Sequence, residues 1–151
     1  MNCLIRNATN ADALAISRII IGTLRESNAL DYSSAIIDQV ESSFSPSAIL
    51  DLLTRRQVLV ATTDSHIVAT ASLDQDVVRS VFVDPTWQGK GIGRQLMAMI
   101  QSIAIKDGVS LLRVPSSITA QGFYAALGFK KIRDEFHQSE RTIIMAKTLE
   151  H

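Results

Sequence analysis

The chain is poor in cysteine, proline and aromatic residues, and it has no excess of either charge. Cys3 is the single cysteine among 151 residues, so an internal disulfide and a cysteine-based metal cluster are excluded, and a reducing compartment is indicated. Lysine and arginine number 15, as do aspartate and glutamate, and this balance argues against a nucleic-acid partner. The sequence has no apolar run of the ~20 residues that a bilayer requires and no recognisable signal peptide. We therefore expect a cytoplasmic protein with no membrane contact.

The composition is that of an ordinary globular domain. Hydrophobic residues make up 46% of the chain and charged residues 20%, which excludes a disordered protein. A length of 151 residues corresponds to one domain. We expect residues 1–148 to form that domain and residues 149–151, Leu-Glu-His, to be the remnant of a vector-encoded tag.

Hydrophobic periodicity predicts helices near the N-terminus and a mixture of strands and helices after them. The predicted helices are 12–26, an amphipathic stretch capped by Ser33, a third beginning at Ser45-Pro46, 91–106 and 119–127. The predicted strands are 4–6, 58–62, 67–73, 77–83, 109–114, 129–136 and 141–147. Residues 27–29 should break the first helix, and Pro115 should end its strand because proline cannot donate to a ladder. The strand–loop–helix–strand order over 77–114 predicts a parallel pair.

A glycine-rich loop joins the predicted strand 77–83 to the helix that follows it. Gly89, Gly91 and Gly93 allow close approach of a ligand, and the first N–H groups of a helix attract anions. The loop therefore predicts a phosphate or pyrophosphate site. The Walker and dinucleotide patterns do not fit, because Arg94 stands where they need a different residue. The alternative is a helix start that uses glycine only for tight packing.

Two segments carry a resemblance to a known family. Residues 88–93, Gln-Gly-Lys-Gly-Ile-Gly, resemble the Q/R-x-x-G-x-G/A signature of the GNAT superfamily of N-acetyltransferases. Residues 120–129, with Phe123-Tyr124 and Gly128-Phe129, resemble that family's A-x-x-F-Y-x-x-x-G-F segment. The resemblance implies an α/β fold, classed as α+β in some schemes. Its mixed central sheet would have about six to seven strands, with helices on both faces and a splayed parallel pair at the acetyl-CoA site.

The resemblance implies acetyl-CoA as co-substrate and no metal. The pantetheine arm would lie between the splayed strands and bond to main-chain groups of Phe82 and Val83. The pyrophosphate would lie on the loop and the start of the next helix, at Gln88, Gly89, Lys90, Gly91, Ile92, Gly93 and Arg94. Ser117 falls where many relatives carry an asparagine that contacts pantetheine. It either makes part of that contact or, like Ser116, caps the following helix.

The implied reaction is direct acetyl transfer to a primary amine, with a small molecule as the default acceptor. Tyr124 would protonate or hydrogen-bond the leaving thiolate, and a core tyrosine is the alternative. A backbone N–H, that of Val83, would hold the oxyanion. The sequence identifies no general base. Arg79 stands where some relatives carry glutamate, and it either receives an anionic group of the substrate or faces solvent.

The acceptor pocket is expected in residues 28–44. Tyr32 would overhang the thioester end, where its hydroxyl contacts the substrate or serves capping and packing. Two other functions stay open at this point, a non-catalytic acyl-CoA sensor and an acetyltransferase acting on a protein amine. Homodimers are frequent in the family, but no residue in this chain requires one.

Overall fold

The computed structural model describes residues 3–26, 30–137 and 140–150, and its strands form one sheet. The strands are β1 (Leu4–Asn7), β2 (Gln57–Thr63), β3 (His66–Asp74), β4 (Val77–Val83), β5 (Leu111–Ser116), β6 (Lys130–His137) and β7 (Glu140–Thr148). Their order in the seven-stranded sheet is β1-β2-β3-β4-β5-β7-β6. Neighbouring strands are antiparallel except β4 and β5, which are parallel as the sequence predicts.

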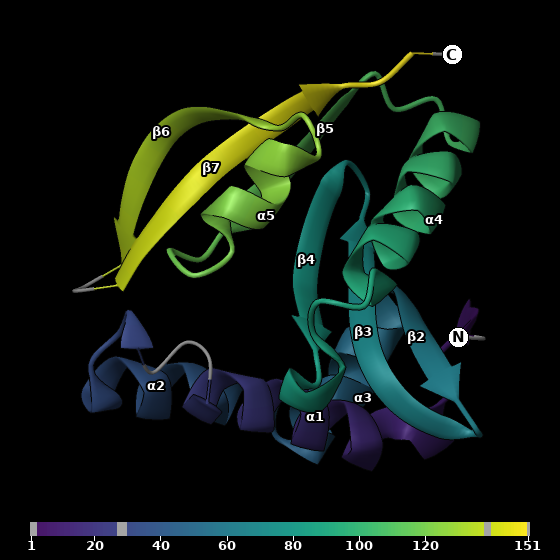
Figure 1. The fold of residues 1–151 in the computed structure, drawn as a ribbon, viewed down its shortest axis with the longest axis vertical. Coiled ribbons are helices and arrows are strands. Elements are labelled where there is room, and N and C mark those ends of the chain that lie inside the picture. The colour runs from purple at the N-terminus through teal and green to yellow at the C-terminus, as the bar shows by residue number, and fades with distance from the viewer. Residues whose placement is uncertain (1–2, 27–29, 138–139, 151) are drawn as a thin grey trace.

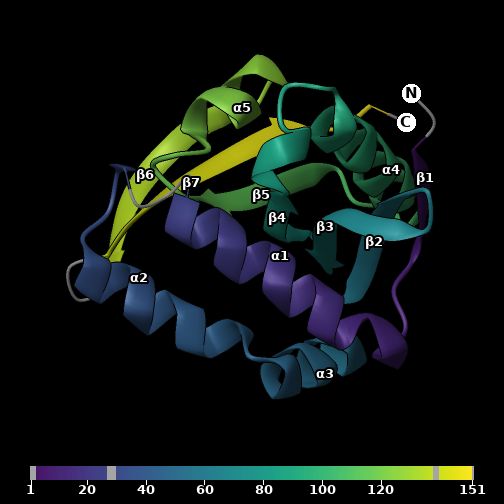
Figure 2. The same ribbon diagram turned by 60° about the horizontal axis from the view of Figure 1, so that its bottom comes forward.

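Helices cover both faces of this sheet (Figure 1). The α-helices are α1 (Ala13–Glu26), α2 (Ser34–Glu41), α3 (Pro46–Arg55), α4 (Ile92–Lys106) and α5 (Gln121–Ala126). Short 3-10 helices are η1 (Asn10–Asp12), η3 (Ser42–Phe44) and η4 (Pro85–Trp87). Figure 2 shows α1 and α3 on one face and α4 and α5 on the other. This arrangement confirms the predicted mixed α/β fold. Within the described residues, no helix has the length and apolarity needed to span a membrane.

The predicted helix starts at Ser33 and Ser45 are confirmed. The Ser33 hydroxyl accepts from the Ile36 N–H at 3.3 Å, and the Ser45 hydroxyl accepts from the Ala48 N–H at 3.2 Å. Pro46 occupies the first turn of α3, where its missing N–H costs no hydrogen bond. The predicted break at 27–29 lies outside the described residues.

The prediction that Pro115 ends its strand is wrong, because β5 continues to Ser116. The Arg113 N–H donates to the Asp76 carbonyl at 2.9 Å, so the N–H groups of alternate β5 residues face β4. The N–H that Pro115 lacks would therefore have pointed toward β4. Only Val77 and Arg113 pair β4 with β5. The two strands no longer pair beside Pro115, and the ladder loses no bond there.

The core consists of two apolar clusters, one on each face of the sheet. Leu96, Met97 and Ile100 of α4 are fully buried against the first face. Ile16 and Ile20 of α1 pack on the second face, together with residues of α2 and α3. The helical spacing of these apolar residues explains why the sequence predicts both helices.

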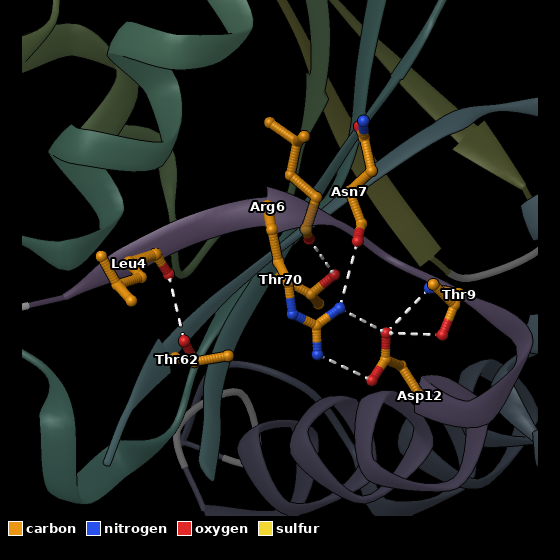
Figure 3. Close-up of polar contacts among 8 residues, drawn as sticks. Leu4, Arg6, Asn7, Thr9, Asp12, Thr62 and Thr70 are labelled. Atoms are coloured by element: carbon orange, nitrogen blue, oxygen red, sulfur yellow. Dashed lines mark hydrogen bonds and ion pairs between the residues drawn. The ribbon is translucent and has the colours of Figure 1, made fainter. Parts of the chain in front are cut away.

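Asp12 ties the start of the helical region to edge strand β1 (Figure 3). Its carboxylate accepts two bonds from Arg6, at 2.8 and 3.0 Å, and one from the Thr9 N–H at 2.8 Å. The Arg6 hydrogen bond is the largest of the causes that lower the pKa of Asp12 to about 2. The buried carboxylate is therefore ionised at neutral pH.

We expect Asp12→Asn to lower the free energy of unfolding by about 1–2 kcal/mol at pH 7, allowing for screening by solvent at Arg6. Because the folded pKa is depressed, the contribution is fully present above the unfolded pKa near ~3.9 and is lost as pH falls through about 2. Urea unfolding at pH 7 and pH 2.5 measures the difference. Asp51→Asn, which removes an exposed pair with Arg55, is the control and should cost under ~0.5 kcal/mol. An equal loss at both pH values for Asp12→Asn would contradict this account.

Candidate active site

The parallel strands β4 and β5 meet at one end and then separate (Figure 1). At the closed end, one Arg113 nitrogen donates to both Asp76 oxygens at 3.1 Å. Farther along, the register of β3 against β4 shifts between Thr70 and Ser72, and Ser80 adopts a left-handed backbone with φ of 57°. A bulge of this kind bends its strand, which accounts for the divergence of β4 from β5.

A cleft of about 1070 Å³ opens between the diverging strands. It brings together nearly all the side chains and loop positions singled out from the sequence. They are Tyr32, Arg79, Phe82, Val83, Gln88, Gly89, Gly91, Ile92, Gly93, Arg94, Ser117 and Tyr124. Lys90 is the exception, because it is exposed and does not line the cleft.

The main chain of β4 directs its polar groups differently at Val83 and at Phe82. The Asp84 N–H donates to the Val68 carbonyl of β3 at 2.8 Å. Alternation along the strand therefore turns the N–H and carbonyl of Val83 away from β3, toward the gap. The same alternation turns the Phe82 main chain toward its β3 partner, Thr70. This geometry corrects the sequence prediction for Phe82, whose ring lines the cleft but whose main-chain groups face away from it.

The Val83 carbonyl is held from two sides. The Thr23 hydroxyl of α1 donates to it at 3.2 Å, and the Gln88 side-chain amide donates to it at 3.0 Å. Gln88 therefore braces the glycine loop against β4, and a pyrophosphate contact through its side chain stays a prediction. Thr23 is a site residue that the sequence did not reveal, because the contact joins positions 60 residues apart.

The glycine loop uses its three glycines in two ways. Gly89 and Gly91 have φ of +77° and +84°, a backbone that strains any other residue. Gly93 is helical, and a Cβ there would lie 3.1 Å from the Phe123 ring. The packing explanation thus applies to Gly93, while Gly89 and Gly91 shape the loop itself.

The start of α4 offers main-chain donors beside this loop. Gly91 is the N-cap, and the first bond of the helix runs from the Gln95 N–H to the Gly91 carbonyl at 3.1 Å. The amides of residues 92–94 precede that bond, so they have no acceptor within the helix. Together with the Arg94 side chain in the cleft, they form a positively polarised cradle suited to phosphate.

Tyr124 reaches the cleft from α5. It is only 4% exposed, and its ring packs edge-on against Phe123 and Phe129 at centroid distances of 5.1 and 5.7 Å. Burial raises the pKa of its phenol well above the ordinary value near ~10. The hydroxyl therefore remains protonated at neutral pH and can donate a hydrogen bond or a proton.

Ser117 and Ser116 both take part in the turn that precedes α5. The Ser117 hydroxyl accepts from the Ala120 N–H at 3.1 Å, and the Ser116 hydroxyl donates to the Ser117 carbonyl at 2.7 Å. The N-cap of α5 is Ala120, which makes no side-chain cap bond, so Ser117 closes the preceding turn and does not cap the helix, and it also lines the cleft. A contact between Ser117 and pantetheine stays a prediction.

Tyr32 fastens the segment before α2 across the cleft. Its hydroxyl accepts from the Ile118 N–H at 2.6 Å and donates to the Arg141 carbonyl at 3.3 Å. Next to it, the Asp31 carboxylate accepts from the Thr119 hydroxyl at 2.8 Å. The structure therefore gives the Tyr32 hydroxyl a bridging role, while its side chain still lines the cleft.

We expect Tyr32→Phe to lower the free energy of unfolding by about 1–2 kcal/mol, because the Ile118 N–H loses its acceptor in a partly buried place. Thermal and urea unfolding provide the measurement. Thr119→Val, which removes the exposed bond to Asp31, is the matched control and should cost less than ~0.5 kcal/mol. Equal losses in the two variants would show that the phenol bridge is unimportant.

Charged side chains gather on two walls of the cleft. Arg79 of β4 pairs with Asp74 at 3.4 Å, and Arg56, which follows α3, lies close by. Glu135 and Glu140 line the opposite wall, from β6 and β7. Arg56 went unrecognised in the sequence because no local pattern places it next to β4. Within the described part of the chain, no three histidine, cysteine or acidic side chains are grouped to hold a metal ion.

Comparison with known proteins agrees with this geometry. A family model for the acetyltransferase (GNAT) domain matches residues 29–149. An uncharacterised N-acetyltransferase of Chlorobaculum tepidum is 30% identical over 133 residues, which cover 87% of this chain and 78% of that protein.

Solved structures share the fold. An N-acetyltransferase from Rhodopseudomonas palustris has a TM-score of 0.94 at 22% identity, covering 99% of this chain and 97% of that one. The PaiA N-acetyltransferase from Thermoplasma acidophilum, in complex with coenzyme A, has a TM-score of 0.84 at 21% identity and covers 98% and 99%. YncA from Salmonella typhimurium, with its cofactor acetyl-CoA, has a TM-score of 0.70 at 22% identity and covers 100% and 96%. The family match over most of the chain, on a fold with diverging β4 and β5, places this protein in the GNAT family of acetyltransferases.

Proposed function

We propose that this protein transfers an acetyl group from acetyl-CoA directly to a primary amine of a small molecule. The observation that carries the proposal is one cleft that joins three features: the Val83 main chain turned into the gap, the cradle at the start of α4, and buried Tyr124. Relatives of the same fold have been solved with coenzyme A and with acetyl-CoA. The balanced charge and single cysteine support an acceptor other than nucleic acid and a cytoplasmic location.

The cleft residues fit acetyl-CoA, which supplies a thioester whose acetyl group is open to attack by an amine. The pyrophosphate would bind the glycine loop and the cradle at the start of α4, where Gly91 lacks a side chain that would fill the space. The Val83 N–H would bind the pantetheine arm or the oxyanion that develops during attack. Ser117 lies on the opposite side of the gap, where it would contact the same arm.

Tyr124 would act as the acid at the departing sulfur. Its burial keeps the phenol protonated, so it can donate to a thiolate as the thiolate forms. A non-catalytic sensor has no need for an acid at this place, which favours the transferase. The incoming ammonium must lose its proton first. Glu140 of β7 lines the cleft and would attract this cation, whereas Glu135 is paired with Arg133 at 2.6 Å.

We expect kcat/KM to rise about tenfold per pH unit toward the pKa of the acceptor amine. An alkylamine has a pKa near ~10.4, so only about one molecule in 2,500 is neutral at pH 7. Because the pKa of Tyr124 is raised, its phenol keeps its proton and adds no falling limb below pH ~10. The measurement is the rate of thiol release between pH 6.5 and 9.5. A bell-shaped profile with a fall in that range would contradict the assignment of Tyr124.

The test is a screen of amines for thiol release from acetyl-CoA, with the acetylated product identified by mass spectrometry. Thiol release that depends on a small amine would support the proposal. Tight acetyl-CoA binding without release for any small amine, but with acetylation of added peptides, would replace the acceptor class with protein amines. Tight binding with no transfer to either would indicate a sensor.

A further inference from the structure

We propose that the acetyl acceptor carries a carboxylate, which Arg56 and Arg79 bind at the β4 wall of the cleft. This inference rests on the proposed amine acetyltransferase function and names the class of acceptor. The acceptor is therefore an amino acid, or another amine that bears a carboxylate.

The two arginines reach the same wall from different elements. Arg56 is the C-cap that follows α3, on the sheet face that α1 and α3 cover (Figure 2), and its guanidinium donates to the Ser80 hydroxyl at 3.2 Å. Arg79 precedes Ser80 on β4, and both arginines line the cleft. Ser80 thus has two roles. Its left-handed backbone is part of the bulge that bends β4, and its hydroxyl accepts the hydrogen bond from Arg56.

The local charges do not balance. Asp74 pairs with Arg79 at 3.4 Å, and no carboxylate among the described residues forms an ion pair with Arg56. Neighbouring Arg55 pairs instead with Asp51 and does not line the cleft. Burial, followed by the charge of Arg79, lowers the pKa of Arg56, although a guanidinium stays charged at neutral pH. Burying a charge without a partner is costly, so an anionic ligand that pairs with this half-buried guanidinium would be stabilised there.

A carboxylate is the anion that best fits this place. A guanidinium presents planar, paired donors that match the two carboxylate oxygens. Val83, the predicted oxyanion donor, lies four residues beyond Arg79, and the bulge at Ser80 makes their separation shorter than the about 13 Å of an extended strand. An arginine side chain spans part of that distance, and an acceptor with an amine at one end and a carboxylate at the other spans the rest.

The experiment compares ω-amino acids of increasing chain length with their own carboxamides, which match them in size but lack the charge. The rate of thiol release gives kcat/KM for each member. The ratio of acid to amide should exceed about ten for the best chain length in the wild-type protein. Arg56→Gln and Arg79→Gln should each lower that ratio at least about tenfold, mainly through KM.

Arg55→Gln is the matched control, because it removes the same charge one residue away, outside the cleft. The ratio of acid to amide should keep its wild-type value in this variant. Arg56→Lys keeps the charge without the paired donors and should retain an intermediate ratio. A merely structural role of Arg56 would lower both rates together and leave the ratio unchanged. An unchanged ratio in Arg56→Gln, or a wild-type ratio near one, would overturn the proposal.

Failure of the proposed function would be seen separately, as absence of thiol release with every amine. In that case, calorimetric titration of the same acids and amides into the protein with saturating CoA tests whether the two arginines bind a carboxylate. Acid-selective binding that Arg56→Gln weakens would support the site. Absence of acid-selective binding would overturn it.

Discussion

Replacing Gly91 by glutamate will weaken acetyl-CoA binding by at least about 100-fold, measured by calorimetric titration. Gly91 caps α4 with φ of +84°, immediately before the cradle amides of residues 92–94. A glutamate side chain there is strained and places a negative charge beside the predicted pyrophosphate. Like charges in contact cost several kcal/mol, enough for a loss of that size.

The control for Gly91→Glu is Gly108→Glu at the other end of α4. Gly108 has nearly the same backbone, with φ of +82°, and open space around its Cα, but it does not line the cleft. Both variants should lose a similar amount of stability through backbone strain. Only Gly91→Glu should lose affinity for acetyl-CoA. Equal affinities in the two variants would show that the loop does not hold the ligand.

Replacing Tyr124 by phenylalanine will lower kcat about 100-fold, because the sulfur loses its acid. The affinity for acetyl-CoA should change less than about threefold, since one hydrogen bond at the sulfur is a small part of the binding surface. The ring keeps its contacts with Phe123 and Phe129, so the variant should fold normally. Steady-state and single-turnover thiol release give the rates, and calorimetry gives the affinity.

Single-turnover rates are needed for Tyr124→Phe because slow product release in the wild-type protein could hide a change in chemistry. A normal melting temperature establishes that the core around the ring is intact. If the single-turnover rate equals that of the wild type, the thiolate leaves without help from Tyr124. The phenol would then be a packing residue of α5.

The sequence predicts the parts of this fold that depend on local patterns. The apolar spacing in α1 and α4 follows the helical period, and Ser33 and Ser45 cap their helices as expected. The loop at Gly89 and Gly91 is recognisable because those positions need a left-handed backbone. The order of elements, and with it the fold class, follows from these signals.

The sequence does not reveal features that depend on register or on contacts between distant segments. The bulge at Ser80 lies in an ordinary β-rich stretch, and nothing local separates Phe82 from Val83 as the residue facing the gap. The bonds of Thr23 to Val83 and of Tyr32 to Ile118 join elements that meet only in the folded chain. Each of these features arises from tertiary packing, so periodicity and capping signals do not predict it.

The most direct test of the account is a titration of the protein with acetyl-CoA followed by amide NMR spectra. We expect the largest shifts at Val83, at residues 89–94 and at Ser117, because these groups line the gap and the cradle. Amides of β1, which β2 and β3 separate from β4, should keep their positions. Shifts centred on other elements, or no shifts at about millimolar acetyl-CoA, would contradict the claim that the gap between β4 and β5 is the acetyl-CoA site.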